Sequence, residues 1–481
     1  MKSLISRFLS LFSVSDRLQQ ISVQQAYYLR PTAVRVAVDD CPVMISFPIL
    51  HTRLVIMQEK RLGHVDDQPS ACFLVMPMEH DKADIEGFIR LHARGESVII
   101  GSHDDYQASV LGYPIGMDLR NLKITHDGDG LIFNTLVSDA EVVLESIPRS
   151  HQARYMDHRK HCLKTIRDIY GGPIQLLAKA ESIDSIKQVN EILQSEVYRP
   201  HDDRGRPGGI LEIPDDLTPI VFGDLHAQVD NLLTLLSQNR FLDLLDTGRA
   251  VLIILGDAVH SEVTGELDKM DSSLLIMDII FRLKIRFPRQ VFYIRGNHDS
   301  FSQDVFKAGV AQSMMWEHAV RDTRGHQYLE EYKRFYQLLP YLAISTDFVA
   351  CHAAPIRTKF DRKMLINIHR YPGLVRQLTR NRLRRRNFPA GYHKNDVVHF
   401  RKELGVSPET QFLVSHSPLN RKDPLWRDAG RIKHHHIVFS ANIPWIGVFT
   451  RIDGRMLPLS YHREPIGELI GQLDNPDTVD E

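Results

Sequence analysis

Acidic and imidazole side chains directly follow an apolar run in the stretch TPIVFGDLHAQVDNLLTLL, residues 218–236. Pro219–Phe222 predicts a buried strand, and the leucines that recur at helical spacing predict a helix after it. Asp224 and His226 lie between the two. Residues i and i+2 of a strand point the same way, so both side chains face one point if strand geometry continues through Leu225. Two ligands of one metal ion would be arranged in this way.

The same pattern recurs four more times along the chain. Each recurrence is an apolar run that predicts a strand and ends in a carboxylate, an imidazole or an amide. Open α/β sheets bind ligands beyond the carboxyl ends of their strands, so we expect these side chains to converge. One strand-end histidine or aspartate is usually structural, but five are difficult to explain by packing alone. The further runs are followed by Asp257, by Arg295 with Asn297 and His298, by His352, and by His416.

The types of these side chains indicate the metal. Carboxylates, imidazoles and an amide oxygen suit Mn, Fe or Zn, whereas cages made only of oxygen suit Mg or Ca. About six ligands exceed the needs of one ion, but two ions roughly 3.5–4 Å apart that share a bridging carboxylate would use all of them. We therefore predict two divalent metal ions, with Mn²⁺ preferred and Fe or Zn as alternatives. Such a pair activates water and neutralises the charge of a phosphoryl transition state.

The motifs together resemble the calcineurin-like metallophosphoesterases, and more narrowly the PPP phosphoprotein phosphatases. GDLHAQVDNLLTLL resembles the family block GD-[IL]-HGQ, with Ala227 in place of the second glycine. YIRGNHD resembles LRGNHE, CHAAP resembles HGGLSP, and IVFSANIPWIG resembles FSAPNYCG. The resemblance covers residues 219–457, about half of the chain, and the combined motif set is highly specific. It implies an α/β/β/α sandwich.

The resemblance also implies which residues hold the metals. One ion would be bound by Asp224, His226 and Asp257. The second ion would share Asp257 and add the ligands Asn297, His352 and His416.

Three further residues are implied in catalysis and substrate binding. His298 would give a proton to the leaving alcohol, because an alkoxide leaving group needs an acid. Arg295 would clamp phosphate oxygens, which suit a guanidinium fork. Trp445 lies where the family places an aromatic ring over the phosphate site, although core packing explains it equally well.

One block departs from the family. The usual GDYVDRG is GDAVHSE here, so His260 replaces the acid that orients the GNH histidine and Ser261 replaces a phosphate-binding arginine. An imidazole cannot stabilise a neighbouring imidazolium as a carboxylate can. We predict that His260 is a catalytic and substrate-binding residue that contacts phosphate. The alternatives are that His260 merely orients His298, or that another carboxylate, with Asp299 as a candidate, does so. Some bacterial members carry GDxxH, so we interpret the chain as a bacterial subtype in which every metal position is filled.

Composition excludes several classes of protein. The formal net charge of −1 does not favour nucleic acid or a membrane surface. The four cysteines form no CxxC pair, which indicates a reducing compartment without a thiolate zinc site. No run of about 18 apolar residues predicts a transmembrane helix. We expect a cytoplasmic protein, with export as an effector as the alternative.

The 481 residues predict two to four domains. The N-terminal stretch MKSLISRFLSLFSV predicts an amphipathic helix that docks on its own protein, with peripheral membrane contact or a role in secretion as alternatives. The rhythm of strands from Ser97 to Leu144 resembles a forkhead-associated (FHA) domain, but Ser102 stands where that family has an arginine, so the resemblance leaves phosphothreonine binding open. The expected fold is α/β, and its segments are an N-terminal helix (1–29), a β-rich FHA-like domain (30–148), a helical segment and linker (149–216), the PPP-like metallophosphatase domain (217–465) and a C-terminal tail (466–481).

The leading functional hypothesis is a metal-dependent phosphatase of phosphorylated proteins or peptides, acting on Ser/Thr or Tyr phosphomonoesters. A phosphodiesterase or dinucleoside polyphosphate hydrolase on the same fold is the first alternative, and a phosphopeptide-binding adaptor is the second. The six arginines of residues 376–387 predict a solvated helix face or a rim that attracts an acidic or phosphorylated substrate. Nucleic acid is not expected there, because no aromatic residues interleave with them.

Overall fold

The computed structural model describes residues 19–473, apart from 22, 24–25, 31, 38, 40, 49–51, 60–71, 78–88, 92–93, 102–109, 113–120, 138–140, 148–149, 239, 264, 303–304, 307–308, 421–422, 442–444 and 453. The chain forms two compact units, one of residues 1–79 and 89–153 and the other of residues 80–88 and 154–481. Within the described part of the chain, no helix has the length and apolar character needed to cross a membrane.

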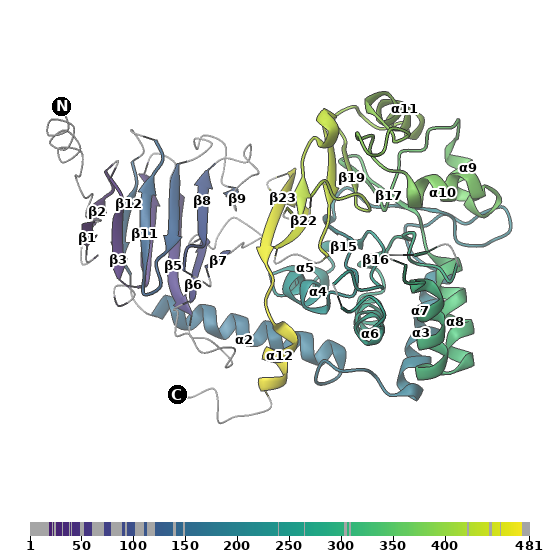
Figure 1. Ribbon diagram of the computed structural model, residues 1–481, viewed down its shortest axis with the longest axis horizontal. Helices are drawn as coiled ribbons and strands as arrows, with labels where there is room; N and C mark the ends of the chain where they lie inside the picture. The colour runs from purple at the N-terminus through teal and green to yellow at the C-terminus, as the bar shows by residue number, and fades with distance from the viewer. Residues whose placement is uncertain are drawn as a thin grey trace, which may run out of the picture. The chain divides into compact units, whose positions relative to one another are not determined.

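The second unit is built on two mixed sheets with helices outside them (Figure 1). Helices α4, α5 and α6 cover the sheet of β14, β15 and β16, whereas α9, α10 and α11 cover the sheet of β18 and β19. This is the α/β/β/α arrangement expected from the sequence. The first sheet has the order β16 (Val291–Tyr293), β15 (Ala250–Ile254), β14 (Thr218–Phe222), β22 (Trp445–Ile452), β23 (Arg455–His462), and the second has the order β13 (Ile210–Glu212), β17 (Leu342–Ile344), β18 (Phe348–Cys351), β19 (Gln411–Val414), β21 (His435–Val438), β20 (Leu425–Trp426).

Strand pairing brings the polar strand ends together. Strands β14, β15 and β16 are parallel neighbours, and so are β18, β19 and β21. Their carboxyl ends therefore lie at one edge of each sheet, which is the edge where the predicted ligands follow.

The helices of this unit, with the single 3₁₀ turns η3 and η4, are α2 (Ser150–Tyr170, which begins in the first unit), α3 (Lys179–Gln194), α4 (Val229–Leu236), α5 (Phe241–Asp246), α6 (Asp271–Arg286), α7 (Gln312–Arg324), α8 (His326–Leu338), α9 (Arg362–Ile366), η3 (Ile368–Arg370), α10 (Pro372–Arg380), α11 (Lys394–Leu404), η4 (Ala429–Arg431) and α12 (Ile466–Gln472).

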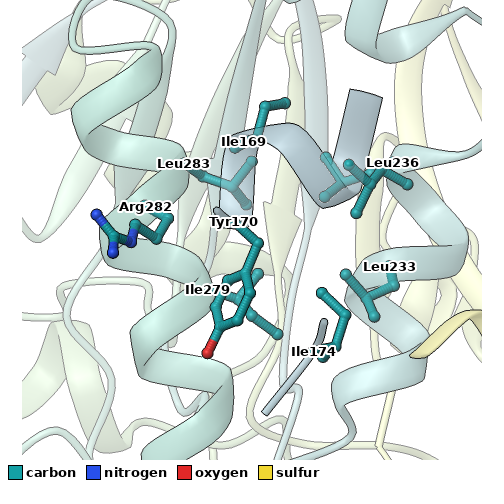
Figure 2. Close-up of a pocket in the computed structure, with 9 residues that line it drawn as sticks. Ile169, Tyr170, Ile174, Leu233, Leu236, Ile279, Arg282 and Leu283 are labelled. Carbon is teal, nitrogen blue, oxygen red and sulfur yellow. The ribbon is translucent and has the colours of Figure 1, made fainter. Parts of the chain in front are cut away.

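The stretch expected to be a linker packs into this unit instead. Helix α3 contacts α6, α7 and α8, and Asn190 donates hydrogen bonds to Glu331 on α8. The expected tail likewise begins with α12, which packs on α4 through the amide of Gly467 and the carboxylate of Asp230. A cavity of about 10 Å³ between helices α2, α4 and α6 is lined by Tyr170, Arg282 and aliphatic residues, which include Ile174 beyond the end of α2 (Figure 2). That volume is close to the minimum for one water molecule, so we attribute the cavity to imperfect packing.

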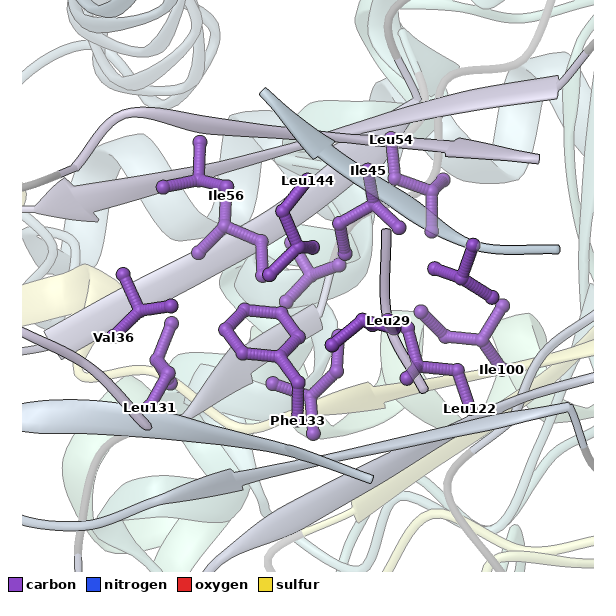
Figure 3. Close-up of a cluster of buried hydrophobic side chains, with 14 of the residues drawn as sticks. Leu29, Val36, Ile45, Leu54, Ile56, Ile100, Leu122, Leu131, Phe133 and Leu144 are labelled. Atoms are coloured by element: carbon purple, nitrogen blue, oxygen red, sulfur yellow. The ribbon is translucent and has the colours of Figure 1, made fainter. Parts of the chain in front are cut away.

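The first unit is β-rich, as predicted, and consists of two six-stranded sheets. Alternate side chains point inward, as the burial of Leu122, Ile124, Leu131 and Phe133 shows, and those of both sheets meet in one core (Figure 3). The sheets have the orders β1 (Gln19–Ile21), β3 (Val34–Ala37), β11 (Gly130–Thr135), β10 (Leu122–His126), β8 (Ser97–Gly101), β9 (Val110–Gly112), and β2 (Tyr27–Tyr28), β12 (Val143–Ser146), β4 (Val43–Phe47), β5 (Thr52–Glu59), β6 (Cys72–Pro77), β7 (Ile89–Leu91).

Two predictions concern the N-terminal part of the chain. The stretch predicted to form an amphipathic helix lies outside the described residues, and strands β1 and β2 show that a helix does not extend to residue 29. The FHA-like assignment stays a prediction, because the loop from Ser102 onward also lies outside the described residues.

Candidate metal centre

The five strand-end motifs meet at one buried place. Asp224 and His226 follow β14, but not in the way expected from the sequence. Strand β14 ends at Phe222, and both residues have left-handed backbone, with φ of 48° and 42°. The expected continuation of strand geometry through Leu225 is therefore wrong, because the chain turns sharply before α4.

Left-handed backbone recurs at other residues of the centre. Asp257 has φ of 50°, His260 of 70° and His416 of 60°. Asp and His tolerate this region better than most residues, but each still costs about 1–3 kcal/mol. Position 296 requires glycine for a steric reason, since a Cβ there would clash with Oδ1 of Asp257. Such strain is concentrated where side chains must be aimed at a shared point.

Three ligand atoms lie around Nε2 of His352 at the spacing that a single ion requires. Its Nδ1 donates to the carbonyl of Leu255 at 2.8 Å, which leaves Nε2 to face the centre. This Nε2 lies 3.1 Å from Oδ1 of Asn297, 3.1 Å from Nδ1 of His416 and 3.2 Å from Oδ2 of Asp257. Ligands at about 2.1 Å from an ion and at right angles lie about 3.0 Å apart. The group therefore fits a divalent ion.

A second group adjoins the first through Asp257. The ligand atoms of His226, Asp257 and His298 lie within 4.8 Å of one another, as do those of Asp257, His352 and His416. Nδ1 of His226 bonds to the carbonyl of His260 at 3.0 Å, so Nε2 faces the centre. Asp224 lies 4.0 Å from that Nε2.

The buried charges of the centre balance only with added positive charge. Burial raises the pKa of Asp224, whereas the adjacent His352 and His298 hold the pKa of Asp257 well below its ordinary value against the effect of burial. Burial acts to lower the pKa of His352, but Asp257 and Asp224 outweigh it and raise that pKa to about 9. A proton on His352 thus supplies the positive charge that a bound cation would supply. The donor set and its charge both fit a metal site.

His260 lies beside His298, away from solvent. Its side chain is fully buried, and its Nδ1 is 2.8 Å from Nδ1 of His298. Burial and the neighbouring histidines lower the pKa of His260 well below its ordinary value, so its ring is neutral. Among the described residues its Nε2 has no hydrogen-bond partner. An orphaned acceptor costs less than an orphaned N–H, so we place the proton of His260 on Nδ1, which donates to His298.

Asp299 does not take over the orienting role. One of its oxygens accepts from the hydroxyl of Tyr293 and the other from the amides of Gly296 and Asp257. It holds the loop that carries Asn297 and His298. Ser261 is also buried and bonds to Glu266, so it does not replace the missing arginine.

Arg295 lies at the edge of the centre and Trp445 begins β22. The guanidinium of Arg295 donates to the hydroxyl of Tyr341 at 2.9 Å and to the carbonyl of Asp299 at 3.3 Å. Trp445 is half-buried, and the loop before it, residues 442–444, lies outside the described residues.

Two residues that the sequence did not single out also face the centre. Oε1 of Glu262 is 3.6 Å from the metal-facing Nε2 of His226. The guanidinium of Arg382 donates to the carbonyl of His416 at 3.4 Å, and its charge acts on Asp224 and Asp257. Both lay inside quoted motifs, GDAVHSE and the arginine-rich stretch, but only the fold brings them to this site.

One protein family and several solved structures are similar to this chain. No curated protein matches the sequence. A solved protein serine/threonine phosphatase from Saccharomyces cerevisiae, described as similar to human phosphatase PP5, shares 16% identity over 60% of this chain and 91% of its own, with a TM-score of 0.44. A putative diadenosine tetraphosphatase shares 15% identity over 53% of this chain and 98% of its own, with a TM-score of 0.29. The calcineurin-like phosphoesterase family model matches residues 217–442, so the chain contains a calcineurin-like phosphoesterase domain and is a hydrolase.

Proposed function

We propose that the protein is a metal-dependent phosphoprotein phosphatase that hydrolyses phosphomonoesters of Ser/Thr or Tyr. The observation that carries the proposal is the pair of buried ligand groups that share Asp257. One ion would be held by Asp224, His226 and Asp257, and a second by Asp257 with Asn297, His352 and His416. Two ions, with Mn²⁺ preferred, would supply an activated water and neutralise charge on the phosphoryl group.

The remaining side chains fit a phosphate dianion. Arg382 and Arg295 place two guanidinium groups at the edge of the centre, and guanidinium groups pair well with phosphate oxygens. A monoester has the two negative charges that would use both, whereas a diester has one. This difference favours the phosphatase over the phosphodiesterase alternative.

His298 would act as the acid for the leaving alcohol. Burial lowers its pKa to about 4, and a phosphate dianion beside the ring would favour the charged form. While His298 is neutral, the Nδ1–H of His260 points at its Nδ1 and holds its proton on Nε2. To act as the acid His298 takes up a second proton on Nδ1, which then donates to Nδ1 of a His260 ring that carries its own proton on Nε2. We therefore assign His260 the positioning of His298, in preference to the contact with phosphate that the sequence also allowed. Trp445 remains a proposed substrate contact.

A substrate panel tests the proposal. Purified protein with Mn²⁺ is assayed on p-nitrophenyl phosphate, on bis(p-nitrophenyl) phosphate and on peptides carrying phosphoserine, phosphothreonine or phosphotyrosine. We expect hydrolysis of the monoester and of at least one phosphopeptide class. Faster hydrolysis of the diester than of every monoester would overturn the proposal.

A further inference from the structure

An arginine-rich loop, residues 382–392, lies against the metal centre. Helix α10 ends at Arg380, so the arginines that follow are not on the helix face expected from the sequence. The loop is closed by a bridge between Leu383 and Tyr392. Arg382 donates to the carbonyl of His416, and Arg385 donates to the carbonyl of Ser417 at 2.6 Å. The loop is therefore fastened to the segment that carries a predicted metal ligand.

The outward side chains of this loop are positive and exposed. Leu383 is buried, and alternate residues of an extended segment face opposite sides, so Arg382 and Arg384 lie on the same side of the segment, opposite Leu383. A tight turn from Arg385 to Phe388 exposes Arg386.

Among the residues that the structure describes, these arginines lack the salt bridges that other surface arginines make. Within the described part of the chain, Arg382, Arg384 and Arg386 form no ion pair. Other exposed arginines of the same unit do, since Arg357 pairs with Asp396, Arg362 with Glu212 and Arg370 with Asp203. The net charge of the whole chain is −1, so this positive edge is a local feature beside the site.

We propose that Arg384 and Arg386 bind acidic side chains that flank the phosphorylated residue of the substrate. The inference rests on the proposed phosphatase function and names the kind of phosphopeptide that the site prefers. Arg384 lies two residues beyond Arg382, or about 7 Å along an extended chain at roughly 3.3 Å per residue. A substrate peptide in extended form spans the same distance in two residues. Acidic residues about two to four positions from the phosphate would therefore reach the loop.

The expected effect is moderate and depends on salt. Exposed charge pairs are individually weak, and they are screened over about 8 Å at physiological ionic strength. We expect loss of both arginines to lower kcat/KM roughly five- to tenfold on an acidic phosphopeptide, mainly through KM, because binding is lost equally in ground and transition states.

The test compares Arg384→Ala/Arg386→Ala with the control Arg289→Ala/Lys164→Ala. The control removes two exposed charges elsewhere in the same unit, since Arg289 precedes the amino end of β16 and Lys164 lies on α2. Substrates are p-nitrophenyl phosphate, a phosphopeptide flanked by Asp and Glu, and the same peptide flanked by Ala, each at low and high salt. Melting temperatures confirm that the variants fold.

We expect the loop variant alone to lose activity on the acidic peptide, with the loss disappearing at high salt and with unchanged rates on the other two substrates. Equal losses on both peptides, an equal loss in the control variant, or stronger competition by single-stranded RNA than by an acidic peptide would overturn the inference. Failure of the wild-type protein to hydrolyse any phosphopeptide while it hydrolyses the diester would instead overturn the proposed function.

Discussion

Two groups of buried histidines in the same unit differ in what their ring nitrogens meet. On β21, Nε2 of His435 accepts from the hydroxyl of Tyr392 at 2.9 Å. His436 accepts at Nδ1 from the amide of Asp428 and donates from Nε2 to Gln411 at 2.7 Å. These rings are saturated by protein groups. They hold strands together and leave no nitrogen for a ligand.

The metal centre shows the opposite arrangement. Nε2 of His352 faces three other ligand atoms, and one of them is Nδ1 of His416. The comparison teaches that burial alone does not mark a functional histidine. The informative feature is whether the ring nitrogens are satisfied by donors and acceptors or converge on each other.

The largest expected effect comes from the shared ligand. Asp257→Asn removes the carboxylate that belongs to both groups, so activity should fall by roughly 100-fold or more. Metal content measured by atomic absorption should fall with it, while circular dichroism stays unchanged. Turnover near that of the wild type at saturating Mn²⁺ would contradict the two-metal assignment.

His298→Ala should act according to the leaving group. General acid catalysis contributes about 100-fold or more where the leaving group needs a proton, and a nitrophenol leaves without one. We expect a much larger loss on phosphoserine peptide than on p-nitrophenyl phosphate in steady-state assays. Equal losses on the two substrates would show that His298 has another role.

His435→Gln is the matched structural variant, and its effect should appear in stability and its pH dependence. Burial lowers the pKa of His435 to about 3, below the ordinary 6.5 of the unfolded chain. The unfolded state therefore binds a proton first as the pH falls, and stability is lost between about pH 6.5 and pH 3. At pH 5 this one residue costs about 2 kcal/mol.

Thermal unfolding at pH 7.5 and pH 5 measures this effect. His435→Gln should lower the melting temperature at pH 7.5, because the Tyr392 hydroxyl loses its partner, but it should show a smaller further drop at pH 5 than the wild type. Bound metal should be unchanged. Loss of metal in this variant would contradict the distinction between the structural histidines of β21 and the histidines of the metal centre.

Glu262→Gln should weaken metal binding without abolishing it. The carboxylate is near the metal-facing nitrogen of His226, and groups that support a metal from this position are worth about 10-fold or more in affinity. Isothermal titration with Mn²⁺ should show one of the two sites weakened. Two unchanged affinities would place Glu262 outside the metal site.

The smallest effect is expected from His260→Asp. A carboxylate beside His298 would stabilise its charged form, so kcat should be preserved or improved and KM should not change. Kinetics from about pH 5.5 to about pH 8.5 cover the histidine range. A rise in KM that exceeds the fall in kcat would instead show that His260 contacts phosphate.

Local sequence correctly predicted the strands that precede the candidate ligands. Apolar runs ending in Asp224, Asp257, His352 and His416 are strands with those residues beyond their carboxyl ends. The strand prediction succeeds because a strand that is buried needs apolar side chains. The prediction of a preferred ion rests on the ligand types alone. The tract KHHHIVFSA, residues 433–441, has three successive histidines as a metal tract would, but its apolar residues predict a core strand, and His435–Val438 form the buried strand β21.

The tertiary structure decided the rest, since the deciding partners are far apart in the chain. The amide of His416 donates to Asp224, 192 residues away, and the left-handed backbone that aims Asp224 and His226 is set by such contacts. Glu262 and Arg382 reach the centre only because separate strands deliver their loops to one edge. Residue types thus determined the chemistry that the chain can perform. Long-range packing alone determined which side chains are left with unsatisfied atoms that converge on one point.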